Sequence, residues 1–419
     1  LRRQPKSAGG DPSGAGAGAC SYGRMEKVIG MMIFWIAAAL AAVWFLQGFA
    51  YGKFWDKGLT ARLFFSKGEI REGEEGEHCE TVENRKMLPL PVLHVNVQVD
   101  RSFVFRTSER TAVSDQTYRR DIFALLPWQR ITRTPPFTGT KRGYYRCRQV
   151  ELVGQDLFFH GPYVKKVEQD ACLYVFPAEV PTEEIQAACQ EMLGDYWNKR
   201  SLFEDPFSFR GIRDYQAGDG MRQVNWKASA RSGELKVNVL ENTAMARARI
   251  LLNLKEDTIW TEEILLESVI RIGAAAALMW LDKGIPAGIC TNGPDVVTGE
   301  PVMVEAGAGP EHGRTILQAL SRINLKGAEG KRNTKDTRLW ESLEAEETYF
   351  YTMVLYISCS SHSEDLEHLE ALRRKGASVL WIWPYTSRQE AFSGSAADTG
   401  CYQGQIRRWR VEEWPDFGS

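Results

Sequence analysis

The sequence lacks several features that would reveal a chemistry directly. It contains no G-x-x-x-x-G-K-[ST] segment, the pattern that cradles nucleotide phosphates, so any nucleotide chemistry must belong to a partner. Its eight cysteines are scattered without a C-x-x-C pair, which favours free buried thiols over a disulfide framework or a zinc site. A formal net charge of -2 argues against a nucleic-acid partner, because such surfaces are usually strongly basic.

Candidates for catalysis are also few. None of the six histidines falls in the charged segment described below. The spacing of His362 and His368 does not suit a shared metal-binding face, so we expect solvated side chains there. Cys290 precedes a Thr-Asn-Gly turn, which resembles the setting of a nucleophile. No histidine or carboxylate can be assigned as its base, so we expect a buried structural thiol.

The sequence does contain enough apolar residues, and is long enough, to form two or three globular domains. It has 419 residues, of which 43% are apolar and 25% charged, as in ordinary globular proteins. Residues 1–24 begin with Leu1, are rich in Gly, Ala, Ser and Arg, and show no apolar periodicity. We expect them to be a disordered leader, or an upstream addition to a protein whose translation starts at Met25.

Residues 25–57 are predicted to hold one transmembrane helix. The run from Val28 to Tyr51 has Gln47 as its only strongly polar side chain, and about 20 apolar residues suffice to cross a bilayer. A cleaved signal peptide is the alternative, but its apolar region would be only about 7–15 residues, and no small-x-small cleavage site follows. The lipid bilayer is therefore an expected partner of this segment.

The charges around this run predict its orientation. If Met25 starts the chain, Glu26 offsets Lys27 before the run, and four cations follow it: Lys53, Lys57, Arg62 and Lys67. The positive-inside rule then places the large C-terminal part in the cytoplasm. Arginines of the leader would weaken this argument if the leader belongs to the mature protein.

Residues 58–180 have the pattern of an antiparallel β-sandwich. Strands are expected at 92–100, 143–152 and 171–177, with Gly-containing turn signals between such segments. Residues 181–205 then form a connecting helix, which we expect over 181–197 because Pro181 and two glutamates mark its first turn.

Residues 242–390 alternate strands and helices, which is typical of a doubly wound parallel α/β sheet. Strands are expected at 248–254, 285–290, 302–304, 348–358 and 377–383, the last of these closing the sheet. Helices are expected at 260–283, 314–323 and 363–375. Residues 391–419 are left as a C-terminal tail.

Residues 206–241 lie between these two regions and are dense in charge and glycine. Gly218-Asp219-Gly220 is a turn signal, and the Asp219 carboxylate is suited to cap a short helix beginning at Gly220. Ser232-Gly233 ends that helix, and a strand follows. Because arginine can hold a carboxylate with two hydrogen bonds, we expect Arg–carboxylate pairs to cross-link the segment and to fasten the two regions together.

This segment resembles the signature of the bacterial family catalogued as domain of unknown function 58. The pattern is roughly G-x-R-x-Y-x-x-G-D followed by R-x-[IV]-x-W-x-x-S-A-R-x-G-x-L-x-V. All of its fixed positions are present: Gly211, Arg213, Tyr215, Gly218, Asp219, Arg222, Val224, Trp226, Ser229, Ala230, Arg231, Gly233, Leu235 and Val237. The resemblance implies a membrane protein with a fold similar to the von Willebrand factor type A domain. It also implies an AAA+ ATPase of the MoxR type as partner. The family has no established activity.

Type A domains that bind Mg²⁺ carry a D-x-S-x-S run after their first strand, because hard cations need oxygen ligands. The equivalent run here begins with Asn253 and places Lys255 where a hydroxyl should be, and residues 358–361 offer hydroxyl groups but no aspartate. We therefore expect no metal and no cofactor.

Two hypotheses of function remain. The first is a membrane-anchored interaction scaffold without catalytic residues, in which the type A-like domain docks on an ATPase. The second is a cell-envelope enzyme that uses Asp214, Asp219 and the neighbouring arginines as an acid–base pair. The surrounding arginines favour ion pairing over catalysis, so we expect no enzyme.

Overall fold

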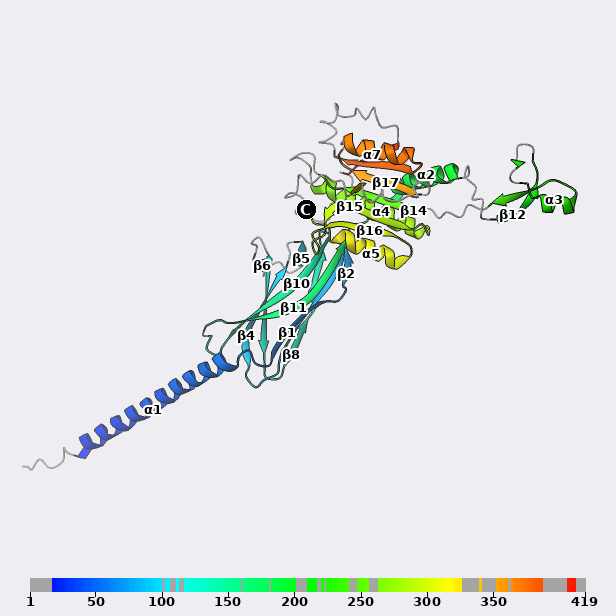
Figure 1. The fold of residues 1–419 in the computed structure, drawn as a ribbon. Coiled ribbons are helices and arrows are strands. Elements are labelled where there is room, and N and C mark those ends of the chain that lie inside the picture. The colour runs from blue at the N-terminus through cyan, green and yellow to red at the C-terminus, as the bar shows by residue number, and fades with distance from the viewer. Residues whose placement is uncertain are drawn as a thin grey trace, which may run out of the picture.

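The computed structural model describes residues 17–99, 102–105, 111–112, 117–159, 161–180, 182–200, 209–216, 220–221, 224–240, 247–255, 263–325, 339–340, 352–360, 363–386 and 405–411. The chain is mixed α/β, with an N-terminal apolar helix and several sheets. Figure 1 shows this helix leading into a unit of strands, above which lie the α/β elements.

Helix α1 (Ala17–Phe54) contains the apolar run. Its segment Ile29–Phe54 has a mean hydropathy of 2.3 and is not covered by the rest of the molecule, so it is long and apolar enough to cross a membrane. The helix begins at Ala17, and the expectation of a disordered leader is therefore wrong for residues 17–24. Once a helix has nucleated, each further residue adds a hydrogen bond, which lets it extend beyond the apolar run.

The end of α1 is built into the next unit without a free linker. Tyr51 and Trp55 are almost completely buried in its core, and the Tyr51 hydroxyl donates to the carbonyl of Pro89 at 2.6 Å. A Cβ on Gly154 would come within 2.9 Å of the Trp55 ring, so the glycine permits this close contact. The amide of Gln47, the polar residue of the run, donates to Asp156 at 3.0 Å.

Residues 59–176 form two sheets that share one core, which we call the two-sheet unit. One sheet has the order β1-β3-β9-β5 with β8 on β3, and the other has the order β2-β11-β10-β4-β7-β6. Both are antiparallel except for the pair β2–β11. The bounds are β1 (Leu59–Phe65), β2 (Glu69–Arg71), β3 (Glu75–Asn84), β4 (Leu90–Val99), β5 (Phe103–Phe105), β6 (Thr111–Ala112), β7 (Thr117–Leu125), β8 (Arg130–Arg133), β9 (Pro136–Gly139), β10 (Gly143–Gln155) and β11 (Tyr163–Phe176).

Alternation along the strands explains this shared core. In β1 the odd positions Leu59, Ala61 and Leu63 are buried and the residues between them are exposed, as expected of a strand with one wet face. Apolar residues of β1 and β3 meet those of β4, β7 and β10 in one cluster.

Helix α2 (Thr182–Arg200) leads onward and confirms the helix predicted over 181–197. A six-stranded sheet follows in the order β16-β15-β14-β17-β18-β19, formed by β14 (Arg247–Asn253), β15 (Ala287–Pro294), β16 (Pro301–Gly307), β17 (Thr352–Ser358), β18 (Ser378–Tyr385) and β19 (Gln405–Arg410). Helices α4 (Glu263–Asp282) and α5 (Pro310–Ser321) pack with α2 on one face, and α7 (Ser363–Arg374) packs on the other. We call this sheet with its helices the α/β unit.

Two features of this sheet differ from the expectation. Strand β16 pairs antiparallel with β15, because a short turn at residues 296–298 returns the chain directly beside it, whereas a parallel strand needs a long crossover. Strand β18 is not the last strand. β19 continues the sheet in parallel within the segment expected to be a tail, where Trp409 is buried against the core.

Strands β12 (Phe209–Asp214) and β13 (Lys236–Leu240) form a separate two-stranded antiparallel sheet, with helix α3 (Trp226–Ser232) between them. We call residues 209–240 the signature module. Figure 1 shows β12 and α3 lying apart from the two larger units.

Candidate functional site

The signature module is held together by its backbone and by two short polar side chains. Asn225 caps α3, because its side-chain oxygen accepts from the Ala228 amide at 2.9 Å. The Ser229 hydroxyl donates to the Asn225 carbonyl at 2.8 Å and accepts from the Lys236 amide at 2.8 Å, which joins the helix to β13. Gly233 ends the helix in the left-handed conformation with φ of 74°.

Sequence reasoning placed the start of this helix too early. Residue 220 is not helical, and α3 begins at Trp226 with Asn225 as its cap, so the predicted start at Gly220 is wrong. An isolated bridge between Val224 and Val237 holds the chain extended just before the helix. The predicted end at Ser232-Gly233 is confirmed. Gly218, Asp219 and Arg222 lie outside the described residues.

The charged side chains of the module that the structure describes lie at its surface. Asp214, whose side chain is 72% exposed, pairs with Lys236. Arg213 and Arg231 are exposed, and the Arg213 guanidinium donates to the backbone carbonyl of Asp214 at 3.1 Å. An exposed carboxylate paired with a lysine has no feature of an acid–base site, and Asp219, the other member of the hypothesised pair, lies outside the described residues.

The apolar side chains of the module are instead turned outward. Val224 and Val237 are the buried apolar residues among those of the module whose burial the structure describes. The exposed fractions are 47% for Ile212, 62% for Met221, 61% for Trp226 and 44% for Leu235. Tyr215 is half-buried, and its amide donates to the Leu235 carbonyl at 2.9 Å. Large apolar residues gathered on so small a module are typical of a surface that a partner covers.

The two larger units contact each other directly and do not depend on the module. Arg142, on the turn into β10, inserts between α4 and α5. Its guanidinium donates to both oxygens of Glu267, at 2.5 and 3.2 Å, and to the carbonyls of Leu320 and Ile323, at 2.9 and 3.1 Å. The half-buried Arg271 of α4 pairs with Glu72 at 2.8 Å. The described contact between the two regions is therefore made by Arg142 and Arg271, and the expectation that signature arginines fasten them stays a prediction, since Arg222 lies outside the described residues.

Topology points to a second candidate position. In open α/β sheets ligands bind beyond the carboxyl ends of the strands, where the strand order reverses, and here that point lies between β14 and β17. Asn253 ends β14 there. Its side-chain nitrogen donates to the Tyr356 hydroxyl at 2.9 Å and to Asp365 at 3.1 Å, and its oxygen accepts from Asn292 and from the Lys255 amide.

The Asp365 carboxylate closes this network. It accepts hydrogen bonds from Asn253, Tyr356 and, at 3.2 Å, the Trp340 indole, whose ring also stacks on His368. Burial raises the pKa of the Tyr356 hydroxyl well above its ordinary value. A carboxamide that uses both its oxygen and its nitrogen within the protein is a poor cation ligand. The network therefore acts as a structural brace. His368 belongs to it through its stacking on Trp340, whereas the sequence predicted a solvated side chain.

Cysteines follow the sequence-based expectation where they are described. Cys79, Cys147, Cys189, Cys290 and Cys359 are free and buried, and burial raises the pKa of Cys189 to about 12. The last free cysteine of the described residues is Cys172, which is exposed.

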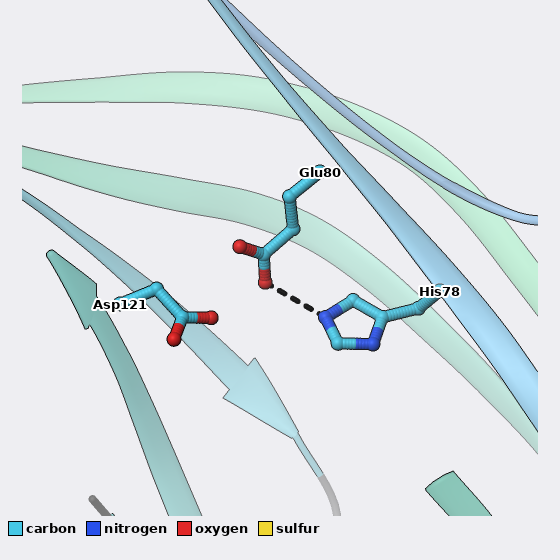
Figure 2. A group of neighbouring side chains, drawn as sticks. All are labelled: His78, Glu80 and Asp121. Carbon is cyan, nitrogen blue, oxygen red and sulfur yellow. Dashed lines mark hydrogen bonds and ion pairs between the residues drawn. The ribbon is translucent and has the colours of Figure 1, made fainter. Parts of the chain in front are cut away.

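One polar cluster was missed by sequence reasoning. His78, Glu80 and Asp121 are all at least 94% buried inside the two-sheet unit, and one ligand atom from each lies within 4.8 Å of the others. Figure 2 shows both carboxylates and the imidazole turned toward one another. The signal was the H-x-E spacing in β3, since residues two apart in a strand share a face. Asp121 comes from β7 of the opposite sheet, a proximity that local pattern does not reveal.

Comparison with known proteins places only part of the chain. Residues 211–347 match the family model described as "Protein of unknown function DUF58", which supports the family resemblance of the signature. No curated protein matches the sequence. Solved structures that match include the CARDB domain of a Pyrococcus furiosus protein, at 13% identity over 27% of this chain and 94% of that chain, with a TM-score of 0.18.

Two others are the full-length major pilin SpaD of Corynebacterium diphtheriae and a non-cellulosomal cohesin of Archaeoglobus fulgidus. The pilin is 5% identical over 28% of this chain and 34% of that chain, with a TM-score of 0.21. The cohesin is 10% identical over 30% of this chain and 96% of that chain, with a TM-score of 0.18. TM-scores this low carry no argument about fold or function.

Proposed function

We propose that this chain, whose signature region matches the DUF58 model, is a membrane-anchored interaction scaffold and not an enzyme. In this proposal α1 spans the bilayer, the two-sheet unit is a β-sandwich held at the membrane surface, and the α/β unit is a von Willebrand factor type A-like domain. The two large units lie in the cytoplasm, on the side of the lysines that follow the apolar run.

The observation that carries the proposal is the exposed apolar surface of the signature module. Met221 and Trp226 are each more than 60% exposed on a module whose described residues bury only two apolar side chains. Buried interface centres are enriched in tryptophan and methionine, so this surface has the composition of a docking site. The family resemblance points to an AAA+ ATPase of the MoxR type as the partner.

Affinity purification tests this proposal. The tagged chain is solubilised in detergent from its native cells, and the proteins recovered with it are identified. We expect an AAA+ ATPase with the wild type, and at least about a tenfold lower recovery with the Met221→Ser/Trp226→Ser double variant, since hot-spot residues cost about 2 kcal/mol or more each.

The two-sheet unit offers a matched control. Met87 and Trp128 are 75% and 67% exposed there, and the Trp128 indole contacts the Met87 sulfur at 3.3 Å. The Met87→Ser/Trp128→Ser variant removes the same residue types and should leave recovery unchanged. If no ATPase accompanies the wild type, the proposed partner is wrong. If both double variants recover it equally, the signature module is not the docking surface.

A further inference from the structure

We propose that His78, Glu80 and Asp121 form a binding site for one divalent transition-metal ion, of the Zn²⁺ or Mn²⁺ type, between the two sheets of the two-sheet unit. His78 and Glu80 project from β3, and Asp121 projects from β7 of the facing sheet. This inference is independent of the scaffold proposal.

Charge is the first argument for an ion. Glu80 is 2% exposed and Asp121 is 6% exposed, so two carboxylates face each other away from water. The guanidinium of Arg119 pairs with Asp121, its Nε lying 2.9 Å from Asp121 Oδ2. Among the described residues the Glu80 carboxylate has no lysine or arginine ion partner and contacts His78 alone, and a buried carboxylate is costly unless a cation or a proton joins it.

An unsatisfied oxygen is the second argument. Glu80 Oε1 accepts from the His78 Nε2 position at 2.7 Å, but Oε2 of the same carboxylate is buried and has no hydrogen-bond partner among the described residues. Buried polar atoms are nearly always paired, and an unpaired one calls for a water or an ion. An ion between the carboxylates would occupy this oxygen and the facing oxygen of Asp121 together.

The ligand types select the class of ion. Imidazole nitrogen suits Zn²⁺, Cu²⁺, Fe²⁺ and Ni²⁺, whereas carboxylate oxygen suits Mg²⁺, Ca²⁺ and Mn²⁺. One imidazole with two carboxylates therefore favours Zn²⁺ or Mn²⁺ over Mg²⁺, which prefers an all-oxygen octahedral shell.

Metal content and a spectrum test the site in the full chain. The detergent-solubilised protein is stripped with a chelator, loaded with Zn²⁺, Mn²⁺ or Mg²⁺, and dialysed. We expect about one Zn²⁺ per wild-type chain and a higher midpoint of thermal unfolding when it is bound, because the ion links the two sheets. Co²⁺ in place of Zn²⁺ should give a d–d spectrum that reports whether sulfur joins the nitrogen and oxygen ligands.

Variants assign the binding to these residues. Glu80→Gln and Asp121→Asn should each weaken Zn²⁺ affinity by more than about tenfold and abolish the thermal shift. Glu77→Gln, an exposed carboxylate of the same strand, should change neither. X-ray absorption at the zinc edge of the wild type needs no variant, and should show an imidazole and oxygen ligands.

Three results would overturn the site. The first is that the wild type retains no Zn²⁺, and the second is that Glu80→Gln retains as much Zn²⁺ as the wild type. The third is a coordination shell of sulfur ligands alone, which would mean adventitious binding at free cysteines.

Discussion

Arg142 shows that the position of a charge decides what it contributes. Its side chain is 3% exposed and donates four hydrogen bonds to α4 and α5, whereas Arg231 of the signature is exposed. Exposed ion pairs typically contribute about 0–1 kcal/mol because water and salt screen them. Removing a buried guanidinium takes this donor away from the Glu267 carboxylate and from the Leu320 and Ile323 carbonyls, which costs more than the loss of an exposed ion pair.

Arg142→Met is therefore expected to lower the free energy of unfolding by about 3 kcal/mol. This value is at the lower end of the range for breaking a buried ion pair, because Glu267 keeps some contact with water. Urea unfolding of the detergent-solubilised chain measures this change. The control is Arg146→Met, which removes an exposed pair with Asp170 and should change the free energy of unfolding far less, because water and salt screen that pair. Equal losses from both variants would contradict the role assigned to Arg142.

At the scale of elements, the turn at Gly233 sets how α3 meets β13. The residue has φ of 74°, which strains any side chain with a Cβ, although a Cβ would meet nothing within 4 Å. Gly233→Ala should destabilise the module by about 1 kcal/mol and lower amide protection in α3 and β13 about fivefold, as measured by hydrogen exchange.

Gly211 provides the comparison for this experiment. It lies in β12, has no positive φ, and a Cβ there would also meet nothing within 4 Å. Gly211→Ala should leave protection in the module unchanged or slightly increased, since alanine loses less backbone entropy than glycine on folding. A similar loss in both variants would mean that φ at Gly233 is not the cause.

Most elements could be predicted from the sequence because their signals are local. The period of apolar residues located β14, α4 and β18 to within a few residues. Strand β19 was missed because QIRRWR carries an arginine at three of its six positions, and only its pairing with β18 explains it as a strand. Tertiary pairing of this kind leaves no trace in a window of six residues.

The candidate sites were harder to predict for the same reason. The signature residues stood out by type, and arginine beside aspartate suggested ion pairs. Their burial depends on what packs against them, and in the structure Arg213, Asp214 and Arg231 are exposed. The Glu80–Asp121 proximity joins residues 41 positions apart on facing sheets, and Arg142 reaches Glu267 across 125 positions. Contacts of this range follow from the whole fold and not from spacing.

At the scale of the whole molecule, side-chain contacts join helix α1 to the two-sheet unit and join that unit to the α/β unit. Tyr51 and Trp55 fix α1 in the two-sheet unit, and Arg142, with the Glu72–Arg271 pair, fixes that unit on α4 and α5. The orientation of α1 in a membrane would therefore determine the side on which both large units lie.

Cys172 can report that side. It lies on β11 of the two-sheet unit and is exposed. The other cysteines whose burial the structure describes are all buried. In a Cys20→Ser/Cys401→Ser background, a membrane-impermeant maleimide added to intact cells should leave the chain unlabelled, and the same reagent should label it after lysis. Cys172→Ser should abolish the labelling of lysed cells. Because lysines follow the apolar run, the positive-inside rule requires this result, and labelling in intact cells would place both units outside.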